Sequence, residues 1–308
     1  MTISTHRAAG KRLLDGVSGK IGGLGVRFLS WGLDYEGSTR TSAIIRIGLG
    51  FLLWGRYAND LLPFKHPFGL ETVYCLTFFG LTTLMIVGLW AGMATFLTGL
   101  FGLFTYYYVG HVFGHEPYTH HHTYWLGIAT FYCALTPCGR SFSVDRWLAV
   151  RKAHKDGAPP PPERGNLFGL RLIVLQLSAM YFWTAYDKTF WGFLSGDRLE
   201  QIFVNFYVGS NAGMWMKYGF AFAAAAILVT LLEYALAFGL PFTKTRRWLL
   251  IPGLLMHSAF YVMLPVATYS ATIVLLYLAY FDADRVHRFI DQLAGNDRAL
   301  PRLDYTDG

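Results

Sequence analysis

Five of the ten histidines lie within twelve positions, from 111 to 122. His111 and His115 are four residues apart, a spacing at which one helix face can hold a metal ion. The other three are adjacent: His120, His121 and His122. Imidazoles exchange protons near neutral pH, so the cluster also suits a proton relay. The plain alternative is an interfacial polar turn whose imidazoles cap helix ends and meet water, and we name no metal on this pattern alone.

A second candidate is Lys188, which stands in an aromatic segment that runs from Tyr181 to Gly192. Tyr181 and Thr184 lie seven and four residues before Lys188, so a helix places the three side chains on one face. A dry pocket disfavours the charged form of an amine, which leaves a neutral amine that can act as a base. The alternative is a lysine that snorkels to the membrane surface.

Four further polar residues interrupt apolar stretches: Arg46, Arg56, Glu233 and His257. Ionisable groups at membrane depth are costly and therefore mark a partner or a function. Glu233 and Arg46 both fall toward the predicted inner side, so we expect a buried ion pair between them. For His257 we expect a hydrogen bond to a neighbouring carbonyl, with ligand binding as the alternative.

Composition identifies the surroundings that hold these residues. Of the 308 residues, 54% are hydrophobic and only 15% are charged. Soluble domains carry about 25% charged residues, so the composition argues against a soluble enzyme. The three cysteines form no C-x-x-C motif, and no dense basic run suggests a nucleic-acid partner. No apolar stretch follows the first residues, and we expect no cleaved signal peptide.

The apolar stretches predict an all-α, polytopic membrane bundle of about eight transmembrane helices in one domain. Residues 1–40 form an N-terminal segment, residues 41–282 the transmembrane domain with an inside loop at 139–166, and residues 283–308 a tail. The predicted spans are Ser42–Leu62, Thr72–Leu89, Met93–Gly110, Thr123–Thr136, Phe168–Tyr186, Tyr218–Phe238, Trp248–Pro265 and Ala267–Phe281.

The basic residues orient these spans. With the N-terminus inside, nineteen of the 26 lysines and arginines fall in inside segments and four in outside segments. This asymmetry predicts that both termini are cytoplasmic and that the protein is integral to the inner (plasma) membrane. In the N-terminal segment, apolar residues recur every three or four positions from Leu14 to Trp31, which predicts an amphipathic helix on the membrane surface.

The order of the polar landmarks resembles a known family, the horizontally transferred transmembrane domain that forms the membrane core of vitamin K-dependent γ-glutamyl carboxylases. The resemblance covers about Thr41 to Phe281. The matching stretches are His122-Thr-Tyr-Trp-Leu, then Ser143-Val-Asp145; Arg171, Gln176 and Tyr181-Phe182, then Lys188 and Gly196; and Glu233 before Pro241-Phe242, then His257.

The resemblance implies a lyase or oxygenase that uses a reduced naphthoquinone, vitamin K or menaquinol-like, with O2 and CO2 as co-substrates. Lys188 would be the base in an outward-facing pocket, and His122 with His121 would relay protons or stabilise an oxyanion. The residues expected to bind the cofactor are Tyr181, Gln176, Trp191 and His257. We expect the partners to be the bilayer, a quinone and a peptide or membrane protein.

Two departures weaken the transfer of carboxylase activity. Arg140 stands where the family pattern has a histidine, and the sequence up to Gly308 holds no large luminal domain for a glutamate-rich substrate. Two alternatives therefore stay open. One is a non-enzymatic accessory, peptide-maturation or immunity-type membrane subunit. The other is a membrane di-iron oxygenase, although its histidines would be expected on the cytoplasmic side.

Overall fold

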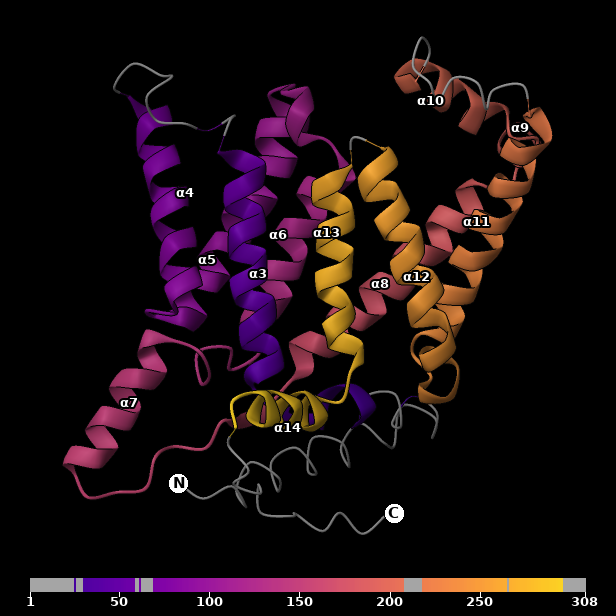
Figure 1. Ribbon diagram of the computed structural model, residues 1–308. Helices are drawn as coiled ribbons and strands as arrows, with labels where there is room; N and C mark the ends of the chain where they lie inside the picture. Colours follow the sequence, from indigo (N-terminus) through magenta and orange to yellow (C-terminus); the bar gives the residue numbers. More distant parts are fainter. Residues whose placement is uncertain are drawn as a thin grey trace. The chain divides into compact units, whose positions relative to one another are not determined.

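The computed structural model describes Gly25 and residues 30–58, 61, 69–207, 218–264 and 266–295. This described part is all-α apart from one short strand pair (Figure 1). Two compact units share the chain. The first contains Met1–Leu172 and Phe281–Gly308, and the second contains Ile173–Tyr280. The predicted single domain of residues 41–282 is thus divided within its fifth predicted span.

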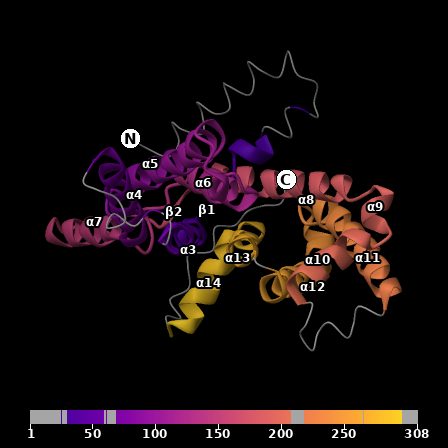
Figure 2. The ribbon, with the colours of Figure 1, turned by 90° about the horizontal axis from the view of Figure 1, so that it is seen from above.

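Four helical segments form the body of the first unit: α3 (Arg40–Tyr57), α4 (Leu70–Val87), α5 (Ala91–Phe104) and α6 (His121–Ala134). Small residues let α5 and α6 approach closely, and Figure 2 shows them side by side. A Cβ atom on Gly102 would lie 3.0 Å from the Cα atom of Gly127. Such small-residue contacts are typical of helices that pack within a membrane. A π-helix, η2 (Thr105–Val112), continues α5, and a short 3-10 helix, η3 (Glu116–Tyr118), precedes α6.

Short elements cover the end of the first unit at which α3 begins. Strand β1 (Glu36–Ser38) pairs antiparallel with β2 (Arg164–Asn166), with Gly37 opposite Gly165. Helix α7 (Val144–Lys155) runs away from the bundle, and α14 (Ala283–Leu293) contacts the first residue of α3 (Figure 1).

Capping contacts explain why α4, α5 and α7 begin or end where they do. Asp145 accepts hydrogen bonds from the backbone N–H groups of Trp90 and Ala91 at 2.9 and 2.7 Å, which satisfies the start of α5. Ser143 caps α7 through the backbone N–H of Arg146. Arg46, fully buried, donates to the carbonyls of Met85 and Ile86 at the end of α4.

The second unit is built from helices in the second half of the chain. Helix α8 (Phe168–Asp187) begins in the first unit and continues into the second, where short α9 (Trp191–Leu194) and α10 (Asp197–Tyr207) follow. Three longer segments complete it: α11 (Gly219–Gly239), α12 (Thr243–Met263) and α13 (Ala267–Leu276), the last extended by the 3-10 helix η5 (Tyr277–Tyr280).

Within the described residues, three helices are long and apolar enough to cross a membrane: Leu70–Val87, Phe168–Asp187 and Gly219–Gly239. This finding supports membrane association. A helix overlaps each of the eight predicted spans, but α3 carries three arginines and α12 contains Pro252 and a basic first turn. The predicted amphipathic helix of the N-terminal segment lies outside the described residues, except for Gly25, Ser30 and Trp31.

Candidate functional site

An ion pair between Lys188 and Glu233 is the centre of the second unit's polar groups. The Nζ atom of Lys188 lies 2.7 Å from both carboxylate oxygens of Glu233. The Glu233 side chain is only 5% exposed, whereas that of Lys188 is 25% exposed. The carboxylate is therefore sealed inside the unit, and the amine forms the edge that remains open to a ligand.

The chain reverses after α8, and this turn brings Lys188 to Glu233. From Lys188 to Gly196 the chain runs antiparallel to α11. The hydroxyl of Thr189 lies 2.9 Å from that of Tyr234. Eight residues after Lys188, Gly196 meets the first turns of α11, where a Cβ atom would lie 2.4 Å from the backbone nitrogen of Ala223. Gly196 also has a φ of +90°, which side chains rarely tolerate.

One aromatic ring lies near the ion pair, and others pack between α8 and α11. The Nζ atom of Lys188 lies 5.8 Å from the centre of the Phe193 ring, and Phe193 itself is buried. On α8, Phe182 packs edge-on against Tyr234 and Phe238 of α11. Rings of this kind exclude water, and exclusion of water strengthens electrostatic interactions and makes proton position sensitive to small changes.

A second group of polar side chains lies deeper in the same unit. The Tyr181 hydroxyl lies 2.7 Å from the Nε2 atom of His257 and 2.5 Å from the hydroxyl of Tyr277. All three side chains are at most 2% exposed. Such a chain of two phenols and an imidazole can pass or share a proton without water.

Gly253 on α12 makes room for this group, because a Cβ atom there would lie 2.5 Å from the Tyr277 hydroxyl. The Nδ1 atom of His257 is buried and has no hydrogen-bond partner in the described part of the chain. An unsatisfied buried nitrogen is unusual and is consistent with a bound water or ligand.

Five of the predicted site residues belong to the second unit, and three of them, Lys188, Tyr181 and His257, make the polar contacts described above. Gln176 is half-buried on α8, and five residues of helix turn it about 140° away from Tyr181. Trp191 is 80% exposed at the start of α9, so it lines no packed pocket within the second unit.

The histidine segment belongs to the first unit. The rings of His120 and His122 stack 5.3 Å apart at the start of α6, and His111 packs edge-on against Tyr106. His115 and His121 are exposed. Among the described residues, no group of three or more histidine, cysteine, aspartate or glutamate side chains is placed to hold a metal. That the histidines share a pocket with Lys188 stays a prediction.

Two predicted partnerships are wrong. Glu233 pairs with Lys188 and not with Arg46, whose guanidinium instead donates to backbone carbonyls, including that of Phe142 at 2.7 Å. His257 bonds to the Tyr181 hydroxyl and not to a carbonyl. In both cases hydropathy marks a polar side chain in an apolar stretch but contains no information on which helices are neighbours.

The depths predicted for Lys188 and Glu233 are also inconsistent with each other. The sequence places Lys188 at the outer end of its span and Glu233 toward the inner side. Glu233 is fourteen residues after the start of α11, which corresponds to about 21 Å of helix. Because the two groups are in contact, both depths cannot hold.

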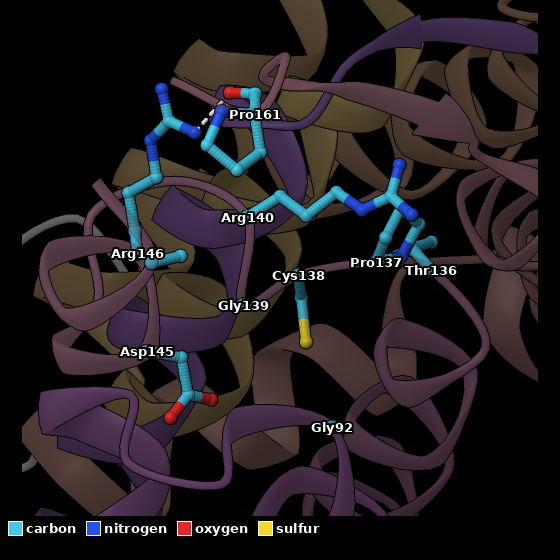
Figure 3. Close-up of a pocket in the computed structure, with 10 residues that line it drawn as sticks. Gly92, Thr136, Pro137, Cys138, Gly139, Arg140, Asp145, Arg146 and Pro161 are labelled. Carbon is cyan, nitrogen blue, oxygen red and sulfur yellow. Dashed lines mark hydrogen bonds between the residues drawn. The ribbon is translucent and has the colours of Figure 1, made fainter. Parts of the chain in front are cut away.

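The Ser143-Val-Asp145 stretch has a structural role that sequence reasoning did not identify. Ser143 and Asp145 each cap a helix. Asp145 also lines a cavity of about 380 Å³ in the first unit (Figure 3). Arg140 and Arg146 also line this cavity, and each donates to a backbone carbonyl, of Arg164 and Pro161 respectively. Both bonds lie within the loop at 139–166, so these arginines hold its two ends together.

Tyr277 and Gly253 are further site residues that the sequence analysis did not single out. The available signal was the spacing of Tyr269 and Tyr277 on α13 and η5, two turns apart in an otherwise apolar helix.

Comparisons with protein-family models, with curated proteins and with solved structures find no match to this chain.

Proposed function

We propose that the chain is a multi-pass membrane enzyme, similar to the membrane core of the vitamin K-dependent carboxylases, in which Lys188 acts as a base on a reduced quinone. The observation that carries the proposal is the contact of the Lys188 amine with the buried Glu233 carboxylate, 2.7 Å to both oxygens, beside the Phe193 ring. Its eight spans, its cytoplasmic termini and its location in the inner membrane are part of the same proposal.

The pair explains how a lysine can act as a base in this position. Burial of the Glu233 carboxylate opposes the charged pair, because a buried charge loses hydration, and this favours transfer of the shared proton from Lys188 to Glu233. A proton that resides on Glu233 leaves Lys188 with a free electron pair. Lys188 is the more exposed partner, so it is the group that a substrate hydroxyl can reach.

The residues present fit a flat, weakly acidic ring. The Phe182 and Phe193 rings offer flat apolar surfaces, the Lys188 amine accepts a proton, and the unsatisfied Nδ1 atom of His257 offers a hydrogen bond. A bound reduced naphthoquinone would supply the acidic hydroxyl and the electrons that O2 requires. Tyr181, held by His257 and Tyr277, would orient a ring oxygen by hydrogen bonding. CO2 capture, and a relay through His121 and His122, are further parts of the proposal.

A non-enzymatic role is the second candidate. The same ion pair joins the end of α8 to the middle of α11, as a structural clamp would. An accessory, peptide-maturation or immunity-type subunit would need the clamp but no quinone and no neutral lysine.

Mass spectrometry of lipid-extractable molecules separates these candidates. The enzyme proposal predicts that a naphthoquinone co-purifies with the wild-type protein, and that the amount falls when Tyr181 is changed to Phe. Protein that takes up no menaquinone or vitamin K when either is added, at any redox state, would contradict the quinone-dependent function.

A further inference from the structure

Helix α14 turns its polar face toward the protein. Asp284 accepts hydrogen bonds at 2.9 Å from the backbone of Ser38 and from the side chain of Arg164. His287 lies 2.7 Å from the Ser38 hydroxyl, and Asp291 lies 2.6 Å from the guanidinium of Arg40. Positions 284, 287 and 291 share one helix face, so these contacts fix the rotation of α14 about its axis.

The opposite face carries apolar side chains that the first unit leaves uncovered. Phe289 is 60% exposed and Leu293 is 73% exposed, four residues apart. Val286 and Ile290 continue the stripe and are partly exposed. We call these four residues the α14 stripe. Because the polar contacts hold the helix in place, the stripe cannot turn inward.

One short stretch of chain and one salt bridge place α14 near a predicted membrane boundary. The chain leaves η5 at Tyr280, and α14 begins at Ala283, at most about 11 Å of chain away. Asp291 near the end of α14 binds Arg40, the first residue of α3. Both Tyr280 and Arg40 lie within two residues of the inner end of a predicted span.

Charge identifies the kind of surface that fits. Arg285 and Arg288 are exposed and lie on the flank between the polar face and the α14 stripe, with Arg285 one turn before Phe289. The acidic side chains of the helix face the other way and are engaged by Arg40 and Arg164. A helix with an apolar stripe bordered by arginines is typical of helices that lie in the interface of a bilayer with anionic lipids.

We infer that α14 is an interfacial anchor, with the α14 stripe among lipid acyl chains and Arg285 and Arg288 at anionic phosphates. The polar network at Ser38 and Arg40 transmits this anchoring to the start of α3. The inference rests on the membrane insertion that is part of the proposed function, but not on any enzymatic activity.

A fluorescent label at Leu293→Cys tests the inference in the full chain. The three native cysteines are at most 2% exposed, so the introduced thiol reacts selectively. The labelled protein is placed in nanodiscs of phosphatidylcholine, with or without phosphatidylglycerol, and with brominated acyl chains as quencher. A label about 5–10 Å into the interface should lose roughly half its emission to bromine, and more when phosphatidylglycerol is present. A label at Ala158, in the exposed loop, should be unaffected.

Charge reversal supplies the matched control. Arg285→Glu with Arg288→Glu should remove the effect of phosphatidylglycerol, whereas Lys152→Glu with Lys155→Glu on α7, an equal change in charge, should not. A Leu293 label that is shielded from water but not quenched by bromine would show a protein cover, such as a second copy, and would overturn the inference. So would a label that behaves like the one at Ala158. Lys188→Arg, which keeps the charge that pairs with Glu233, should leave every readout unchanged, and this keeps the test separate from that of the proposed function.

Discussion

The amine of Lys188 and the carboxylate of Glu233 are joined through both carboxylate oxygens, each at 2.7 Å, although 45 residues separate them in the sequence. The exposure of the two side chains is unequal, 25% for Lys188 and 5% for Glu233. A lone charge on the sealed partner has no access to water, whereas a lone charge on the open partner can reach it. The stability lost on removing Lys188 should therefore differ from that lost on removing Glu233.

Removing one partner should therefore cost unequal amounts of stability. Lys188→Met leaves a buried carboxylate unpaired and should destabilise by about 3–5 kcal/mol, unless the carboxylate takes up a proton. Glu233→Leu should cost less, because Lys188 can be hydrated. The double variant should recover most of the loss. Thermal unfolding of the four proteins in detergent at pH 8 measures this cycle, and additive losses would show that the two groups are not coupled.

Gly196 should be the least replaceable glycine of the turn that carries Lys188. Its φ of +90° and its contact with the backbone of α11 both oppose a side chain. Gly114→Ala is the matched control, because Gly114 has a φ of +72° and nothing within 4 Å of a Cβ atom. The control should lose about 1–2 kcal/mol of unfolding free energy, and Gly196→Ala clearly more. Equal losses in thermal unfolding would mean that close packing on α11 contributes nothing.

Acid should weaken the attachment of α14 through His287. Burial, and after it the charge of Arg40, lower the pKa of His287, although Asp291, Glu163 and Asp284 act in the opposite direction. Its pKa in the folded state thus lies below the unfolded value of about 6.5. The unfolded state binds the proton first as the pH falls. The contribution of neutral His287 to the free energy of unfolding is complete above a pH of about 6.5. It is lost as the pH decreases through the folded-state pKa of His287.

The weakening of the α14 attachment can be measured as the protease sensitivity of the α14 segment between pH of about 7.5 and 5.5. Wild-type protein should become more sensitive toward the acid end. His287→Asn cannot gain the proton, so its sensitivity should change little over the same range. An identical pH dependence in the two proteins would assign the effect to other groups.

Membrane orientation can be measured at two exposed positions. Ala158 lies in the loop predicted inside, and Glu116 lies in the turn predicted outside. A thiol reagent that cannot cross the membrane should label Glu116→Cys and not Ala158→Cys in intact cells, while both should react after permeabilisation. The reverse pattern would invert the proposed topology.

The sequence predicted the helices better than it predicted their neighbours. Hydropathy locates α4, α8 and α11, because an apolar run long enough to span a membrane has few other stable conformations. It also located Lys188, Tyr181 and His257 as polar residues in apolar surroundings. Hydropathy contains no information on which faces meet, and for that reason Glu233 was assigned to Arg46.

Local backbone chemistry was likewise missed. The sequence pattern assigns Ser143 and Asp145 to a family resemblance. In the structure, Asp145 accepts hydrogen bonds from N–H groups at the start of α5, and Ser143 accepts one from an N–H group in the first turn of α7. Serine is a preferred N-cap residue, so the role of Ser143 follows from local chemistry, whereas the bonds of Asp145 to α5 depend on the tertiary fold. Gly196 was noticed for its spacing from Lys188, and the structure supplies the physical reason in its φ and its contact with Ala223.

The substitution Lys188→Arg tests the central claim most directly. Arginine keeps the positive charge and can still pair with Glu233, so folding and the ion pair should survive, but a guanidinium does not give up its proton in proteins. With a menaquinol added to reconstituted wild-type protein, we expect quinol-dependent O2 consumption that is lost in Lys188→Arg, with quinone binding retained. If Lys188→Arg consumes O2 at the wild-type rate, Lys188 is not the base, and its contact with Glu233 is a structural clamp.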